Sequence, residues 1–128
     1  MKIEGIVVHG RALGRTIGFP TANVQAEKRD GDGADGVYAA WFSTGEKHMP
    51  CMVNIGHHPT LPGGGRSVEA HIFDCSDDLY GLRVSVETVE FLRGEIEFPS
   101  AEALRRQLEL DKQRALEILN MHTPPGIK

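Results

Sequence analysis

Thr21 and Asn23 are the first two side chains in this sequence whose types and spacing could do chemistry. They follow a proline in the segment Pro20-Thr21-Ala22-Asn23. In an extended chain, side chains two positions apart point to the same face, so the Thr21 hydroxyl and the Asn23 amide oxygen would lie together. Hard oxygen donors of this kind suit Mg²⁺, which keeps the rest of its shell for water and phosphates. The spacing alone favours an ordinary turn after proline, and both interpretations stay open.

Glu69 and His71 form a second pair on one face of an extended segment, in which Val68, Ala70 and Ile72 occupy the other face. If the apolar residues face a core, Glu69 points outward, and a solvated carboxylate is the simplest interpretation. A glutamate that acts as a general base would instead need a cleft and a substrate hydroxyl within hydrogen-bond reach. The pattern by itself favours the surface carboxylate.

The glycine-rich segment from Gly10 to Pro20 looks at first like a phosphate-binding loop. A Walker A loop needs a glycine, four residues and then Gly-Lys-Ser/Thr. Here Gly10 is one residue too close to Gly14-Arg15-Thr16, and Arg15 stands in place of the lysine. Phe19-Pro20 removes a backbone donor and favours extended structure where the Walker loop would begin a helix. The segment is therefore not a Walker loop.

The cysteines and histidines do not form a recognisable metal site. Cys51 and Cys75 lie in separate segments without C-x-x-C spacing, so two free thiols are favoured over a disulfide. No two of the six histidines have a recognised ligand spacing with a third partner, and His57 and His58 are adjacent. A zinc site is not predicted.

The composition indicates one globular domain over residues 1–128. The chain is 40% hydrophobic and 25% charged, and it is long enough to bury one core. Its formal net charge of −4 lacks the basic excess of a typical nucleic-acid-binding protein. No apolar run is long enough to cross a membrane or to serve as a signal sequence. We expect a cytoplasmic protein with neither a nucleic-acid nor a membrane partner.

The elements that must position these residues are mostly strands. Apolar and alternating segments predict strands at 3–9, 36–42, 49–55, 67–73 and 82–92, with a short extended piece at 21–24. The alternation in the last strand is imperfect around Val89 and Phe91, which indicates a bulge. Residues 26–36 and 61–66 are polar or glycine-rich, so we expect surface loops that close over substrates.

One helix is predicted near the C-terminus. Ser100 is a suitable N-cap, and Glu102 lies in the first turn, where the helix dipole favours an acid. Apolar residues recur at helical spacing from Leu104 to Leu119, and Asp111 interrupts this stripe. Asp111 would either cap a second short helix or accept hydrogen bonds from a neighbouring loop, and a structural role is favoured. Together the elements indicate an antiparallel barrel or sandwich with a packed C-terminal helix.

Several motifs along the chain, in the same order, resemble the riboflavin kinase (flavokinase) family, which includes the C-terminal domain of bacterial FAD synthetases. The specific part is Gly-Phe-Pro-Thr-Ala-Asn together with the Glu-x-His-Ile strand. The matching pieces are Gly5–Gly10, Gly14–Asn23, Gly36–Tyr38, Asn54–Gly56 with Pro59–Thr60, Val68–Ile72, Asp78–Gly81, Leu92–Arg93 with Phe98, and Leu104, Gln107, Leu108, Asp111 and Ala115. The resemblance implies a six-stranded antiparallel Greek-key barrel with a C-terminal helix.

The resemblance also implies an activity, which is transfer of the ATP γ-phosphoryl group to the 5′-hydroxyl of riboflavin to give FMN and ADP. It implies that Thr21 and Asn23 hold Mg²⁺ and that Glu69 is the catalytic base. Arg93 and Phe98 would lie on the flavin side. The residues implied at the nucleotide are Gly10, Arg15, Gly18, Pro20, Ile72 and Tyr80. We expect a monomer.

Bacterial members of the family usually carry an N-terminal adenylyltransferase domain that converts FMN to FAD, and no segment of this sequence resembles it. We therefore expect the chain to make FMN and to stop there. The alternative is a catalytically inactive flavin- or nucleotide-binding barrel. The presence of Thr21, Asn23 and Glu69 together disfavours that alternative.

Overall fold

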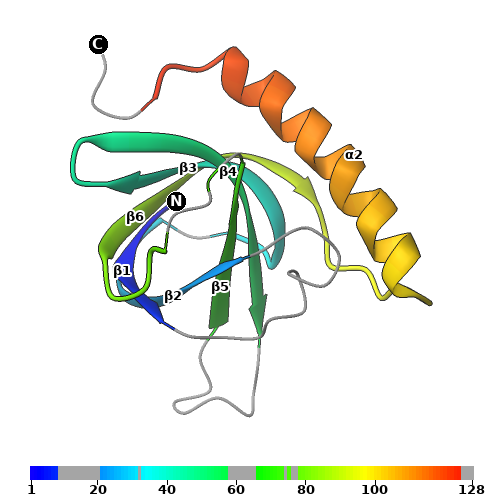
Figure 1. The fold of residues 1–128 in the computed structure, drawn as a ribbon, viewed down its shortest axis with the longest axis horizontal. Helices are drawn as coiled ribbons and strands as arrows, with labels where there is room; N and C mark the ends of the chain where they lie inside the picture. Colours follow the sequence, from blue (N-terminus) through cyan, green and yellow to red (C-terminus); the bar gives the residue numbers. More distant parts are fainter. Residues whose placement is uncertain (9–20, 32, 58–65, 74, 76–77, 125–128) are drawn as a thin grey trace.

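The computed structural model describes residues 1–8, 21–31, 33–57, 66–73, 75 and 78–124. In these residues it contains six strands and one helix, and Figure 1 shows the helix lying along one side of a barrel. The elements are β1 (Lys2–Val8), β2 (Ala22–Asp30), β3 (Gly36–Thr44), β4 (Lys47–His57), β5 (Arg66–Ile72), β6 (Arg83–Arg93) and α2 (Ala101–Asn120).

The six strands close into an antiparallel barrel in the order β1-β2-β5-β4-β3-β6. Strands β3, β4 and β5 are sequential neighbours, and β6 returns to lie beside β3. This spatial order is that of a Greek key. The fold implied by the family resemblance is therefore confirmed, including the helix that packs on the barrel.

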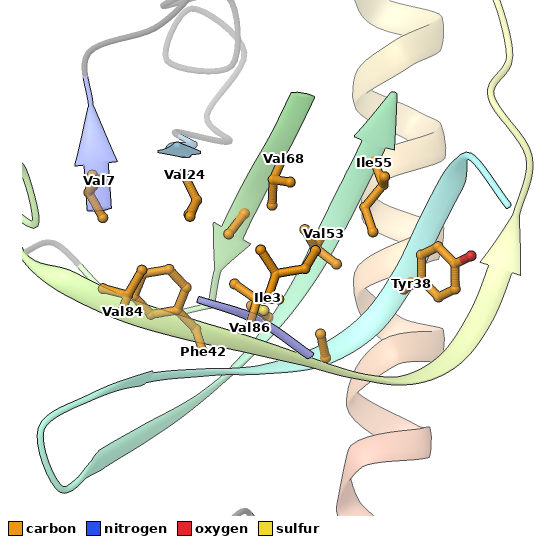
Figure 2. Close-up of a cluster of buried hydrophobic side chains, with 13 residues drawn as sticks. Ile3, Val7, Val24, Tyr38, Phe42, Val53, Ile55, Val68, Val84 and Val86 are labelled. Atoms are coloured by element: carbon orange, nitrogen blue, oxygen red, sulfur yellow. The ribbon is translucent and has the colours of Figure 1, made fainter. Parts of the chain in front are cut away.

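The barrel interior is filled by alternate residues of all six strands. Successive side chains of a strand point to opposite faces, so the core residues within one strand lie an even number of positions apart. Figure 2 shows these side chains converging between the strands. The buried members are Ile3, Val7, Val24, Tyr38, Ala40, Phe42, Cys51, Val53, Ile55, Val68, Ala70, Val84 and Val86. Cys51 and Cys75 are free thiols, as predicted.

A second core lies between the outer face of the barrel and α2. Ala115 and Leu119 of the helix pack there against side chains of several strands, among them Trp41 and Met52. The predicted N-cap is confirmed, because the Ser100 hydroxyl accepts a hydrogen bond from the backbone N–H of Ala103. The helix thus covers part of the outer face of the barrel.

The prediction of a surface loop over 26–36 is wrong for residues 26–30, which continue β2 and pair with β1 as far as Lys2 opposite Asp30. The side chains on both faces of this part of β2 are mostly exposed to solvent, which explains why its residues are polar although it forms a strand. The strands approach closely at a register shift, where a Cβ on Gly5 would overlap the Gln25 carbonyl oxygen. The expected loop at 61–66 lies outside the described residues except for Arg66, which begins β5.

The bulge predicted in the last strand is confirmed. The pairing of β6 with β3 shifts register twice, and β6 has an extra residue at each shift, Val89 and Leu92. Extra residues of this kind bend a strand and redirect its side chains. As a result Leu92 reaches the core under α2, and Arg93 lies opposite Val37 at the end of β6.

Candidate functional site

Three polar side chains from three neighbouring strands form a row on the outer face of the barrel. Glu69 on β5 is paired with Asn23 on β2 and with Asn54 on β4. Val68 and Ala70, the chain neighbours of Glu69, are buried inside the barrel, so Glu69 points outward. Directly opposite residues have Cβ atoms about 5 Å apart, so the three side chains can act on one ligand. We call Asn23, Glu69 and Asn54 the outer-face row.

The outer-face row brings together two of the residues that the sequence singled out for chemistry. Asn23 and Glu69 are both half-buried, whereas Asn54 is exposed. Thr21 is half-buried and lies just before β2, two residues from Asn23. A carboxylate therefore stands beside an amide oxygen, with a hydroxyl nearby. This is a set of acceptors that can take a proton and hold a hard cation.

The same row continues across the sheet toward α2. Asn54 is paired with Val37 on β3, and Val37 is paired with Arg93 on β6. Glu69 and Arg93 are thus three strand spacings apart on one face, which is about 14 Å at about 4.8 Å per spacing. The two residues lie at opposite ends of one outward-facing strip, in which Val37 is only 4% exposed and packs in the core under α2.

Arg93 is fixed at its end of this strip by α2. Its Nε and Nη2 lie 2.9 and 2.8 Å from Oδ2 of Asp111, and its Nη1 donates to the Gly94 carbonyl at 3.0 Å. The guanidinium carbon is 5.7 Å from the centre of the Phe98 ring, within the range of a cation–π contact. Arg93 and Phe98, the two residues expected on the flavin side, therefore lie next to each other.

Asp111 has the structural role that the sequence favoured. Its side chain is buried and accepts a further hydrogen bond from Gln107 Nε2 at 3.0 Å. Its other partner is Arg93. The sequence suggested a donor from a neighbouring loop, but Arg93 is the last residue of strand β6. The alternative of a cap for a second helix is wrong, because α2 continues without a break through Asp111. Arg114 adds a hydrogen bond to the Leu92 carbonyl at 2.8 Å.

His71 shares the outer face with Glu69 but has a different environment. It is only 6% exposed, and burial together with the nearby Lys112 lowers its pKa to about 4. The imidazole is therefore neutral near neutral pH. Glu69 is half-buried and therefore more accessible to a substrate than His71.

Two of the six residues expected at the nucleotide are described. Ile72 is partly buried and packs against the barrel interior, and Tyr80 is 54% exposed in the turn that follows β5. This turn is closed by hydrogen bonds from the Tyr80 N–H to the Asp78 carboxylate and from the Gly81 N–H to the Val7 carbonyl. The turn therefore lies beside the end of β1. Gly10, Arg15, Gly18 and Pro20 lie outside the described residues.

Sequence reasoning gave Asn54 no role. The signal that could have identified it is alternation, because Asn54 is exposed between Val53 and Ile55, both fully buried. Its partner Glu69 lies on another strand, so only the register between β4 and β5 connects the two residues.

No helix in the described part of the chain combines the length and the apolar character needed to cross a bilayer.

The chain is similar to proteins of a known family. The family model described as Flavokinase (riboflavin kinase) matches residues 1–119. The bifunctional riboflavin kinase/FMN adenylyltransferase of Escherichia coli K12 is 42% identical over 123 residues, which are 95% of this chain and 39% of the relative. The chain thus spans about two fifths of the curated relative that it matches.

Two solved structures are similar to the barrel. One, titled a macrolide-efflux protein from Streptococcus pneumoniae, has a TM-score of 0.82 and 36% identity, covering 89% of this chain and 38% of that one. The riboflavin kinase of Trypanosoma brucei has a TM-score of 0.66 and 22% identity, covering 93% and 76% of the two chains, and supports the fold alone. The match of the family model over almost the whole chain shows that this chain belongs to the riboflavin kinase family.

Proposed function

We propose that this chain is a riboflavin kinase, which transfers the γ-phosphoryl group of ATP to the 5′-hydroxyl of riboflavin and releases FMN and ADP. The observation that carries the proposal is the pairing of Glu69 with Asn23 on the outer face of the barrel. A base and an oxygen donor for a cation stand side by side there, in a chain of the riboflavin kinase family.

Glu69 is the residue that we assign to proton transfer. The acceptor is a primary alcohol, so a positioned carboxylate that takes its proton contributes about 10² to 10⁴ in rate. Phosphoryl transfer otherwise requires alignment of the two substrates and neutralisation of charge on the transferred oxygens. Glu69 is half-buried on β5, which is paired with β2 on one side and with β4 on the other.

The residues beside Glu69 fit Mg²⁺. The Thr21 hydroxyl and the Asn23 amide oxygen are hard, uncharged donors, which leave room for phosphate oxygens and water around the ion. When bound, Mg²⁺ supplies positive charge to the nucleotide phosphates. In the proposal the Asn23 amide oxygen is a ligand of the ion. Because Asn23 is paired with Glu69, it also places the ion next to the carboxylate of Glu69.

The two substrates approach the outer-face row from different sides in this proposal. The nucleotide contacts Ile72 and Tyr80. Four further residues, which lie outside the described structure, are also assigned to nucleotide binding: Gly10, Arg15, Gly18 and Pro20. The flavin lies toward Arg93 and Phe98. Because the Arg93 guanidinium is already held by Asp111 and Gly94, we assign it to fixing Phe98 and the segment after β6.

We further propose that residues 1–128 act as one monomeric kinase domain in the cytoplasm, without nucleic-acid or membrane partners. The proposal covers the kinase reaction alone, because the match to the bifunctional relative extends over only 39% of that protein.

The test is to incubate the purified chain with riboflavin and Mg²⁺ and to add each nucleoside triphosphate in turn. Chromatography should reveal FMN with ATP. Riboflavin binding without FMN from any donor would instead identify the inactive flavin-binding barrel and would overturn the proposal.

A further inference from the structure

Asn54 is the member of the outer-face row to which the proposed chemistry gives no task. It lies on β4 between Glu69 on one side and Val37 on the other. Asn54 is exposed, although it is in the middle of a strand whose adjacent residues are fully buried. Its side chain is therefore available to a ligand that lies on the strip next to the proposed base Glu69.

The outward positions of β4 on either side of Asn54 are closed to a ligand. Met52 is 2% exposed and packs in the core under α2. Gly56 has no side chain, and a Cβ there would lie 2.8 Å from Oε1 of Glu95, so the Glu95 carboxylate covers that position. Asn54 is therefore the residue through which β4 can contact a molecule lying on this strip.

The size of the acceptor places its sugar-like chain over β4. This step rests on the proposed function, in which the terminal hydroxyl of riboflavin meets Glu69 and the ring lies toward Arg93. The ribityl chain has six bonds from the ring nitrogen to the terminal oxygen, or about 7 Å when extended with bonds of about 1.5 Å. At about 4.8 Å per strand, a chain that starts at Glu69 crosses β4 and ends between β4 and β3.

We propose that Asn54 binds the secondary hydroxyl groups of the ribityl chain and thereby selects polyol-bearing flavins. An amide both donates and accepts hydrogen bonds, and each secondary hydroxyl does the same, so the two groups are complementary. A site that hydrogen-bonds a hydroxyl discriminates against an analogue that lacks it. Asn54 then determines which acceptors are held with their terminal oxygen at Glu69.

The test compares two acceptors and two proteins. The first acceptor is riboflavin, and the second is the flavin analogue with a 5-hydroxypentyl chain, which keeps the ring and the terminal hydroxyl but lacks the three secondary hydroxyls. For riboflavin, Asn54→Ala should lower kcat/KM about 10- to 100-fold, as expected for the loss of one or two hydrogen bonds. For the analogue, kcat/KM should be unchanged, and KM for ATP should be unchanged with both acceptors.

Two further variants make the result decisive. Gln25→Ala removes an exposed amide two residues beyond Asn23 on β2 and should leave kcat/KM for both acceptors at the wild-type value. Asn54→Asp keeps the shape of the side chain and loses its donor, and it should also reduce the preference for riboflavin. If Asn54→Ala does not fold, Asn54→Asp alone decides between the outcomes.

Equal losses with both acceptors, or no loss with either, would overturn the assignment of Asn54. Failure of the proposed function has a different signature, because the wild-type protein would then give no phosphorylated product from either acceptor.

Discussion

Replacing Asp111 with alanine tests how α2 is fastened to the barrel. The Asp111 side chain is 6% exposed, and its carboxylate is contacted by Arg93 from the end of β6 and by Gln107 from the preceding helical turn. The substitution removes the counter-ion of Arg93, whose side chain is itself only 15% exposed. A guanidinium would then remain in a poorly solvated position without its carboxylate.

The expected loss of stability follows from that burial. Removing one partner of a buried ion pair costs about 3 to 5 kcal/mol, and the residual exposure of Arg93 places this pair near the lower value, about 3 kcal/mol. That is a large fraction of the roughly 5 to 15 kcal/mol that stabilises a domain. For a chain of this length it corresponds to a fall in Tm of about 10 °C.

Urea and thermal unfolding, followed by circular dichroism, measure this loss. The matched control is Glu102→Ala, which removes a carboxylate from the same helix that pairs with Arg105 and Arg106 on the surface. The control should unfold close to the wild-type midpoint. The double variant Arg93→Met with Asp111→Leu should regain most of the lost stability, because no charge is left buried. If Asp111→Ala loses no more stability than Glu102→Ala, the reasoning about this ion pair is refuted.

Three other predictions concern the site and its surroundings. Glu69→Gln should lower kcat about 10²- to 10⁴-fold with little change in ATP affinity, and turnover near the wild-type rate would exclude Glu69 as the base. Thr21→Ala should raise the Mg²⁺ concentration needed for half-maximal rate, because it removes an oxygen ligand; an unchanged Mg²⁺ dependence would count against the metal assignment. The pKa of His71 is about 4 in the folded state, below its unfolded value of 6.5, so the unfolded chain binds the extra proton first as the pH falls. The free energy of unfolding should therefore decrease between about pH 6.5 and pH 4, by about 3 kcal/mol at most. Unfolding of His71→Gln across that range should show a flatter pH dependence, and an unchanged slope would contradict the buried, neutral imidazole.

The strands and the helix could be predicted from the sequence where one face is buried. Alternation of Val68 and Ala70 with Glu69 identified β5 and correctly pointed Glu69 outward. The second half of β2 was missed because its side chains are exposed, so no apolar pattern marks it. Its strand character depends on backbone pairing with β1, which local composition does not encode.

The candidate site was only partly predictable for a related reason. The extended segment at Thr21 and Asn23 predicted a shared face, but the proximity of Asn23 to Glu69 depends on the pairing of β2 with β5, about 46 residues apart. The apolar stripe of α2 flagged Asp111 as unusual, but its partner Arg93 is brought to it by the bulges in β6. Asn54 was marked by its place between two apolar residues and by the matching Asn54–Gly56 piece, but neither signal assigns it a task.

The most direct test of the central claim is to follow the γ-phosphoryl group itself. The wild-type protein is mixed with riboflavin, Mg²⁺ and ATP labelled at the γ-phosphorus, and the products are separated and counted. Label should appear in FMN, with one ADP formed for each FMN, and almost no label should appear in FMN with Glu69→Gln. Label that appears only in inorganic phosphate would rule out transfer to riboflavin, and FMN formation that is the same with Glu69→Gln would rule out Glu69 as the base.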